Sequence, residues 1–423
     1  MSIGGSGDDR GSGLDAAGRR RVLTTLCLTQ VTGWGVLFYA FPVLQGSIAD
    51  DTSWSPSSVA AAFTVGQVTA ALAGLVVGRV LDRHGPRLLM TAGSLSALLS
   101  LSLVATAGSL PAFVAAWTLA GASTAAVLYA PAFAAITGWY DGADRLRALT
   151  VLTVAGGLAS TVFAPLTATL HASLGWRSTL LVLAAVLALT VPAHWWGLRG
   201  AWPTRTRQPA SPAHHAPIAV ITSRSFLALT AALAITALCS TAVVVNLVPL
   251  LREHGIDLRT ASLILALGGL GQVAGRLGYG PLAVRLSPVG QGVLILGVLA
   301  ATAGLLGAVS TTYAVVVVVL VAGAARGCLT LLRATAVTDR WGTRHYAQLS
   351  AAMSLPVALA GAAAPWLGAQ LASWLGSYAA GFLVLAGVNA AAVALVLLTR
   401  PERHGSGAPE TIRADVSSQA AGP

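Results

Sequence analysis

The sequence predicts an all-α membrane protein whose helices cross a lipid bilayer many times. The chain has 423 residues, of which 55% are hydrophobic and only 9% charged. Soluble proteins carry about 25% charged residues, so a chain with so few cannot keep its whole surface wetted. Apolar runs of about 20 residues, the length of a helix that spans the hydrocarbon core, recur along this chain. Because no water satisfies the backbone inside a bilayer, such runs form helices.

Twelve membrane-spanning helices are predicted, in two pseudo-symmetric bundles of six. The predicted spans are 22–46, 58–80, 88–107, 111–138, 146–170, 178–197, 224–251, 260–282, 288–309, 312–338, 346–372 and 378–399. The bundles are expected over residues 21–198 and 223–400. The Pro-, Ala- and His-rich segment 199–222 is predicted to be a cytoplasmic linker, and residues 1–20 and 401–423 to be disordered cytoplasmic tails.

Short motifs recur in the same order in the two halves, which predicts an internal duplication. The pairs are Gly74–Arg79 with Gly271–Arg276, Ala135–Thr137 with Ala336–Thr338, Ala164-Pro165 with Ala364-Pro365, and Leu174-Gly175 with Leu375-Gly376. Two related bundles with a central solute site are a recurring transporter plan. The repeats therefore favour a site between the halves.

The arginines predict the orientation, since the chain contains no lysine. If the N-terminus lies inside, only Arg177, Arg252 and Arg259 fall in the outer loops, and most of the 25 basic residues fall inside. Basic residues concentrate on the cytoplasmic side of membrane proteins. Both termini are therefore predicted to be cytoplasmic, in the inner (plasma) membrane of a cell. This topology explains the net charge of +11 without a nucleic-acid partner.

The sequence contains no pattern of residues typical of a catalytic or metal site. The three cysteines lie far apart in apolar runs, without metal-ligand spacing. No predicted span carries Asp, Glu, Lys or His in its core, and no phosphate-binding loop is present. We expect no enzyme activity, no metal and no cofactor. Because arginine does not titrate, facilitated diffusion or anion exchange is favoured over proton symport, unless the substrate itself carries the proton.

A charged loop motif lies between the second and third spans. The segment Gly78-Arg-Val-Leu-Asp82-Arg83-His-Gly85-Pro-Arg87 is similar to the loop motif of the major facilitator superfamily. Together with the twelve-span plan, this resemblance covers nearly the whole chain. It implies the two-bundle transporter fold of that family, in which the aspartate and arginines of the motif join the two halves on the cytoplasmic side.

The resemblance thus implies a gating role for Gly78, Asp82, Arg83, Gly85 and Arg87. Asp82 can accept hydrogen bonds at the positive end of the helix predicted at 346–372. Arg83 and Arg87 can pair with Asp141 or Asp144. The alternative is that these charges only set the topology.

A second, partial resemblance concerns the monocarboxylate and oxalate–formate transporter branch. Gly33, Trp34 and Gly35 in the first span are similar to its signature, but Val31 and Val36 replace its acidic residue and second tryptophan. That family also carries an Asp four residues before an Arg in helix 8. Here Gln272 and Arg276 have this spacing, so the arginine is present and the carboxylate is absent.

Arg326 lies near the middle of the span predicted at 312–338, where charges are rare and usually functional. A guanidinium without a carboxylate at its depth needs an anion, and a carboxylate ligand can bind it bidentately. We predict an organic-anion site here, with Thr330 and Arg333 on the same helical face. The alternatives are hydrogen bonds from Arg326 to a broken neighbouring helix, and a side chain of Arg333 that reaches the interface.

Further candidate substrate ligands come from other spans. The resemblance implies that helices 1, 4, 7 and 10 line the central path. The candidates are Gln30 and Tyr39, Thr124 and Tyr129, and Asn246, together with Gln272 and Arg276. For each of them, hydrogen bonding between packed helices is the alternative.

The predicted function is transport of a small solute, an organic anion such as a monocarboxylate, by a secondary active or facilitative carrier with alternating access. We expect a monomer in the lipid bilayer, with a small-molecule substrate. One alternative is an exporter of drugs or amphipathic metabolites, which a cavity poor in charge would suit. Another is a sensor that binds solute without moving it, although no cytoplasmic output domain is evident in the sequence.

Overall fold

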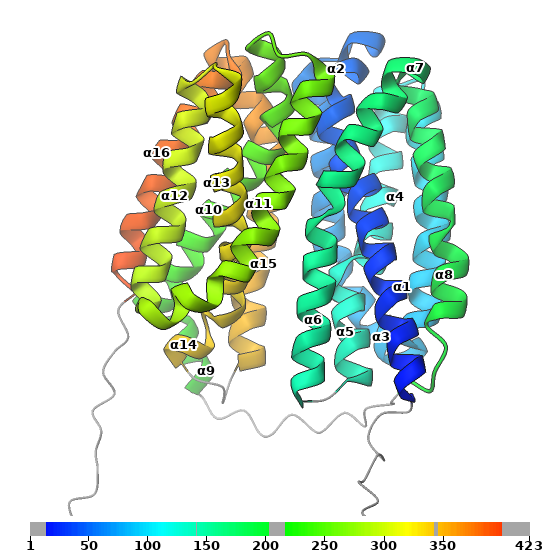
Figure 1. Cartoon of the computed structure of the whole chain (residues 1–423), viewed down its shortest axis with the longest axis vertical. Helices are drawn as coiled ribbons and strands as arrows, with labels where there is room; N and C mark the ends of the chain where they lie inside the picture. Colours follow the sequence, from blue (N-terminus) through cyan, green and yellow to red (C-terminus); the bar gives the residue numbers. More distant parts are fainter. Residues whose placement is uncertain (1–13, 141, 203–215, 342–345, 400–423) are drawn as a thin grey trace, which may run out of the picture.

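Two helical bundles, one from each half of the chain, lie side by side (Figure 1). The structure, a computed structural model, describes residues 14–140, 142–202, 216–341 and 346–399. The first bundle contains α1 (Ala16–Trp34), the π-helix η1 (Gly35–Tyr39), α2 (Ala40–Thr52), α3 (Pro56–Thr106), α4 (Leu110–Val127), α5 (Tyr129–Trp139), α6 (Gly142–Gly157), α7 (Ala159–Ala188) and α8 (Thr190–Gly197). The second contains α9 (Ala216–Ile221), α10 (Arg224–Glu253), α11 (Leu258–Arg285), α12 (Pro288–Ala308), α13 (Thr312–Thr335), α14 (Thr338–Trp341), α15 (Tyr346–Leu375) and α16 (Tyr378–Leu397).

The helices make twelve crossings, as the sequence predicts. In the part of the chain that is described, 10 helical stretches are long and apolar enough to cross a membrane. Two of them, Pro56–Thr106 and Arg147–Gly197, have 51 residues each. Each would be about 76 Å long if straight, more than twice the hydrocarbon thickness. Both fold back at a glycine with a left-handed backbone, Gly85 (φ 75°) and Gly175 (φ 73°), and so cross twice.

Turn geometry repeats between the two bundles. The first crossing of each bundle ends at a residue with positive φ, Ser53 (57°) in one and Gly255 (79°) in the other. The fifth and sixth crossings are joined at Gly175 in the first bundle and at Gly376 (φ 77°) in the second. Glycine adopts these angles without a clash of a Cβ atom. The repeated Leu-Gly pairs of the sequence are therefore matching turns.

Two predicted boundaries differ from the structure. Helix α1 begins at Ala16, inside the predicted tail 1–20, because the Asp15 carboxylate accepts a hydrogen bond from the Gly18 amide at 2.7 Å and caps the helix. Helix α9 lies inside the predicted linker 199–222, where Val220 and Ile221 pack on the core of the second bundle. The rest of both predicted tails, and residues 203–215 of the linker, lie outside the described residues.

The first bundle departs from regular α-helical geometry at several places within its crossings. Helix η1 is a wide π-turn in the first crossing, between α1 and α2. The fourth crossing is broken at Leu128, whose backbone is extended (φ −86°, ψ −151°). In the fifth crossing α6 and α7 are separated only by Leu158, whose backbone stays right-handed (φ −80°, ψ −5°) and whose amide donates to the Ala155 carbonyl in a tightened turn. Wide turns and breaks of this kind often mark functional positions, because they re-aim side chains and free backbone groups.

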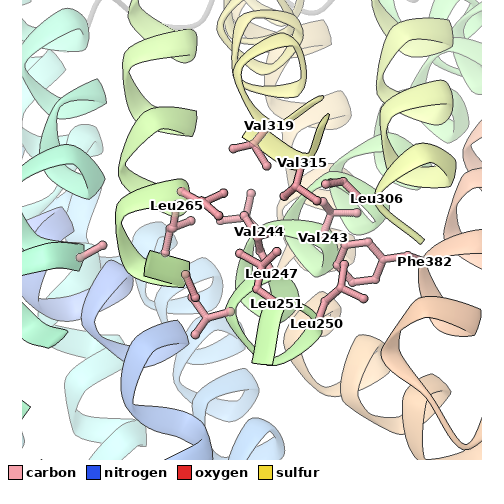
Figure 2. Close-up of a cluster of buried hydrophobic side chains, with 14 of the residues drawn as sticks. Val243, Val244, Leu247, Leu250, Leu251, Leu265, Leu306, Val315, Val319 and Phe382 are labelled. Carbon is pink, nitrogen blue, oxygen red and sulfur yellow. The ribbon is translucent and has the colours of Figure 1, made fainter. Parts of the chain in front are cut away.

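Helix α10 lies at the centre of the apolar core that joins the two bundles. Figure 2 shows side chains of α10 gathered with those of α11, α12, α13 and α16, namely Val243, Val244, Leu247, Leu250, Leu251, Leu265, Leu306, Val315, Val319 and Phe382. The same cluster contains Tyr39, Val43, Ala159, Ala164 and Ala168 of the first bundle. The bundles therefore share one core at this height.

The two ends of the molecule differ in how the bundles meet. We call the end with Ala16, Gly197 and Leu397 the linker face, and the end with Thr52 and Leu375 the opposite face. At the linker face, the apolar clusters contain residues of one bundle only. Nearer the opposite face, the clusters mix residues of both bundles. The bundles are thus joined toward the opposite face and have separate cores at the linker face.

Glycines allow the close crossing of α11 and α13. A Cβ atom on Gly271 would overlap the carbonyl oxygen of Leu320, and one on Gly275 would overlap that of Ala324. On the other helix, Gly323 and Gly327 lie equally close to the backbone of α11. Small residues of this kind let membrane helices pack backbone to backbone.

This crossing can be tested with a matched pair on α11. Gly275→Ala should lower the melting temperature of the purified protein, because overpacking costs about 1–3 kcal/mol. Gly278→Ala is the control, since a Cβ there meets nothing within 4 Å; it should be neutral or slightly stabilising. Equal melting temperatures for the two variants would contradict the packing described.

Candidate functional site

Two guanidinium groups of the second bundle lie within the crossings. Arg276 on α11 is buried, with 9% of its surface exposed, and Arg326 on α13 is half-buried. None of the chain's 14 acidic residues falls in the middle of a predicted span. Inside a membrane, an uncompensated charge costs several kcal/mol or more. How each guanidinium is satisfied therefore decides what the site can do.

Arg276 is satisfied largely by protein groups. Its Nη1 donates to the carbonyl oxygen of Thr153 in α6 of the other bundle, and its Nη2 donates to Oε1 of Gln272 at 3.5 Å. Its buried Nε has no hydrogen-bond partner among the described residues. Helix α6 ends at Gly157, and a cation is favourable near a helix C-terminus. Bonding to a broken neighbouring helix was the alternative expected for Arg326, and it is Arg276 that does this.

Arg326 differs, because its guanidinium has no hydrogen-bond or ion-pair partner among the described residues. It lines a narrow cavity of about 30 Å³ between the bundles. The other bundle contributes Tyr39 and Ser160 to this cavity, and α11 contributes Gly268 and Gly269. A cavity of this size holds a water molecule or a group as small as a carboxylate. It cannot hold a whole organic solute, which needs about 300 Å³ or more.

Five aromatic side chains of the first bundle form a continuous group that we call the aromatic wall: Trp34, Phe38, Tyr39, Tyr129 and Phe133. The rings of Trp34 and Tyr129 are 5.1 Å apart, and those of Trp34 and Phe38 are 5.7 Å apart. Phe38 contacts Tyr39 at 5.2 Å, and Tyr129 stacks on Phe133 at 4.9 Å. The π-turn of η1 and the break at Leu128 are the local irregularities from which these rings project.

The aromatic wall reaches both guanidinium groups. Tyr39 lines the same cavity as Arg326. The Tyr129 hydroxyl lies against Gly156, where a Cβ would overlap it, and Arg276 Nη1 lies against Gly157, 2.8 Å from the position of a Cβ. Two adjacent glycines at the end of α6 thus admit a phenol from one bundle and a guanidinium from the other.

Four predicted ligands bond to helix backbones. Gln30 is fully buried, and its Nε2 donates at 2.8 Å to the carbonyl oxygen of Val127, next to the break at Leu128. Asn246 is also fully buried; its Nδ2 donates to its own helix at Ala242 and lies against Gly368 of α15. The hydroxyls of Thr124 and Thr330 donate to carbonyls of their own helices, at Ala120 (2.8 Å) and Arg326 (3.1 Å). Gln30 and Asn246 therefore have the packing contacts that were their alternative.

Arg333 is exposed and lies close to the end of α13 at the linker face. A long side chain at this position can reach the membrane interface, and this alternative for Arg333 stays a prediction. The structure thus groups Tyr39 with Arg326, and Tyr129 with Gln272 and Arg276, but leaves Arg333 apart from them.

The charged loop between the second and third crossings has few contacts in this conformation. Asp82 and Arg83 are exposed, without hydrogen bonds or ion pairs to other described residues. The Arg87 Nε donates to the Trp195 carbonyl oxygen at 2.9 Å. The guanidinium carbon of Arg87 lies 3.9 Å from the centroid of the Trp195 ring, on which it stacks. Asp144 pairs with Arg147 at 3.6 Å rather than with an arginine of this loop.

The expected pairing of Arg83 or Arg87 with Asp144 is therefore absent here, and Asp144 and Arg87 have other partners. Asp141 lies outside the described residues. Gly85 provides the positive φ of the turn, and Gly78 is exposed one turn before Asp82. The gating roles of these positions stay predictions.

Three contacts that the sequence analysis did not foresee join the bundles toward the opposite face. Gln45 is buried, and its Nε2 donates to the Val245 carbonyl of the other bundle at 2.6 Å. The Thr161 hydroxyl donates to the Ala266 carbonyl, and the Trp366 amide donates to the Thr64 hydroxyl, both at 3.0 Å. The sequence did contain one indication of these contacts: Gln45 lies in an apolar helix, and a buried glutamine needs a hydrogen-bond partner.

In the described part of the chain, no group of three or more His, Cys, Asp or Glu side chains could hold a metal ion. The polar groups between the bundles are instead cations, hydroxyls and amides, which suit an organic ligand with acceptor oxygens.

Comparison with known proteins defines the class. The family model of the Major Facilitator Superfamily matches residues 23–291 and 227–420, so the chain belongs to this superfamily. A search of curated protein sequences gives no match. The superfamily and the twelve crossings make the chain a multi-pass membrane transporter. The resemblance to the monocarboxylate branch stays a prediction.

Two solved structures share the fold. Both are of a bacterial homolog of the human lysosomal transporter Spinster in an inward-facing conformation, one occupied and one unoccupied. The occupied form is 14% identical with a TM-score of 0.66, and the unoccupied form 15% identical with a TM-score of 0.67. Each match covers 91% of this chain and 96% of that one.

The Gln45 contact should stabilise the arrangement in which the bundles meet toward the opposite face. Gln45→Ala removes one buried hydrogen bond, worth about 1 kcal/mol or somewhat more, and should raise the population open at that face roughly fivefold. Maleimide labelling of a cysteine placed at Ala168, which is buried in the shared core, measures this opening in a variant without the native cysteines.

Gln291→Ala is the matched control, because the Gln291 side chain bonds only within the second bundle, to Tyr279, Ala283 and Leu286. It should leave the labelling rate unchanged. Equal labelling in the two variants would show that Gln45 does not join the bundles.

Proposed function

We propose that this superfamily member carries a small organic anion across the membrane, and that Arg326 binds the anionic group. The observation that carries the proposal is the half-buried guanidinium of Arg326, which has no partner among the described residues. A carboxylate supplies both the missing charge and two acceptor oxygens in the geometry of a guanidinium. Arg276, already bonded to Thr153, adds positive potential and presents its free Nε.

The position of the cavity supports a carrier mechanism. Arg326 lies where residues of both bundles meet, so a bound anion contacts both of them. Movement of one bundle against the other around such a site exposes it to alternate sides. The contacts toward the opposite face, with separate cores at the linker face, correspond to one end state of this cycle. With the linker face in the cytoplasm, as the arginines favour, this is the inward-facing state.

Facilitated diffusion or anion exchange remains the favoured mode of transport, rather than proton symport. Both arginines keep their charge throughout the cycle. The buried histidine nearest the linker face, His194, is bonded to Ser94 at 2.9 Å within the first bundle, so it belongs to helix packing. An exporter of neutral drugs would leave Arg326 without a counter-charge, which disfavours that alternative. We infer a monomeric carrier in the inner membrane.

The proposal predicts the behaviour of three variants in liposome uptake of labelled monocarboxylates. Arg326→Gln should reduce initial uptake at least tenfold, because hydrogen bonds to charged groups are worth about 1.5–3 kcal/mol. Arg326→Lys should retain part of the uptake, since lysine keeps the charge but not the bidentate geometry. Arg285→Gln, which removes an exposed arginine at the end of α11, should behave like the natural protein.

Melting curves of all three variants show whether each is folded. If folded Arg326→Gln takes up monocarboxylates at the natural rate, Arg326 is not the anion ligand. Uptake of neutral drugs in place of anions by the natural protein would favour the exporter.

A further inference from the structure

The small volume beside Arg326 bears on the identity of the ligand. The cavity of about 30 Å³ accepts a carboxylate but not the body of an organic acid. The body must therefore lie beyond the cavity, against the groups that continue from it. Tyr39, a lining residue, is the first ring of the aromatic wall, which continues through Phe38 to Trp34 and Tyr129.

The rings of the wall remain partly uncovered. Trp34, Phe38, Tyr129 and Phe133 are all half-buried, whereas Phe41, Phe63 and Phe113 in the same bundle are at most 2% exposed. Fully packed rings stabilise the bundle, but half-buried rings between two bundles leave surface on which a ligand can pack. Their mutual geometry is tilted or edge-on at Trp34, which leaves ring faces free for a further aromatic group.

Trp34 also has an unused donor. Its Nε1 is buried and has no hydrogen-bond partner among the described residues. A buried indole N–H normally finds an acceptor, and leaving it unpaired costs free energy. The ring of Phe163 packs directly against the backbone of the neighbouring Gly35, where a Cβ atom would overlap it. The Trp34 ring packs against two neighbouring apolar clusters, and its N–H is a donor that no described group uses.

We propose that the transported anion is an aromatic monocarboxylate. Its carboxylate binds Arg326 beside Tyr39, its planar ring packs on Trp34 and Tyr129, and Trp34 Nε1 can donate to an oxygen of the ligand. This inference rests on the proposed function and narrows its substrate class. The two bundles then contribute different parts of recognition, since the second holds the charge and the first holds the ring.

Four probes test the proposal by equilibrium binding to the purified full chain: phenylacetate, cyclohexylacetate, acetate and neutral phenylacetamide. Phenylacetate should bind roughly tenfold or more tightly than acetate, because only it buries a ring. The affinity for phenylacetate should exceed that for cyclohexylacetate roughly threefold, because only an aromatic ring makes ring–ring contacts with the wall. Phenylacetamide should bind at least tenfold more weakly than phenylacetate, because it has no charge for Arg326.

Substitutions of Trp34 test whether the aromatic wall causes the preference for phenylacetate over acetate. Trp34→Leu should bring the phenylacetate-to-acetate ratio close to one, and Trp34→Phe should retain most of it. Trp374→Leu is the control, since this tryptophan is 69% exposed on α15 near the opposite face; it should leave the ratio unchanged. The ratios of the natural protein test the proposal even if a variant fails to fold.

The outcomes distinguish the aromatic assignment from the organic-anion function. Acetate or cyclohexylacetate binding as tightly as phenylacetate overturns the aromatic assignment and leaves the organic-anion function standing. The aromatic assignment is also overturned if Trp34→Leu weakens the binding of phenylacetate and of acetate equally. Phenylacetamide binding as tightly as phenylacetate, or no binding of any acid, overturns the organic-anion function itself.

Discussion

The structure depends on one constraint, that polar groups inside lipid must find partners within the protein. The first bundle breaks a helix at Leu128 and ends α6 at Gly157, and side chains from other helices bond to carbonyls near these two points. Gln30 does so at Val127 within the bundle, and Arg276 does so at Thr153 across the two bundles. Irregular backbone is therefore stabilised where the bundles face each other, and this is also where the aromatic wall is formed.

The same constraint separates the two central arginines. Arg276 meets it with a helix carbonyl and a glutamine, so the protein can be stable without ligand at that position. Arg326 does not meet it with any described group, so a bound anion would stabilise the state that holds it. A ligand can shift a conformational equilibrium only through such differential contacts. Since the cavity is lined by both bundles, binding there couples to their relative position.

Hydropathy predicted the helical membrane fold and the twelve crossings, because both follow from local composition. The repeated Leu-Gly pairs indicated an internal duplication, and the structure shows that they form matching turns at Gly175 and Gly376. The site was less accessible to prediction. The sequence drew attention to Arg326 through its depth, but it could not show that Gln30 and Asn246 would be used in packing. The π-turn at η1 and the approach of Tyr129 and Arg276 over two glycines arise only from tertiary contacts, and so does the Gln45 contact between bundles.

A structure with a heavy-atom ligand tests the central claim most directly. Anomalous diffraction from crystals grown with 4-iodobenzoate would place the iodine atom independently of any fitted pose. The account predicts one strong peak between the bundles beside Trp34 and Tyr129, with ligand density continuing to the guanidinium of Arg326. Peaks confined to the outer, lipid-facing surfaces of the helices, with no density at Arg326, would contradict it.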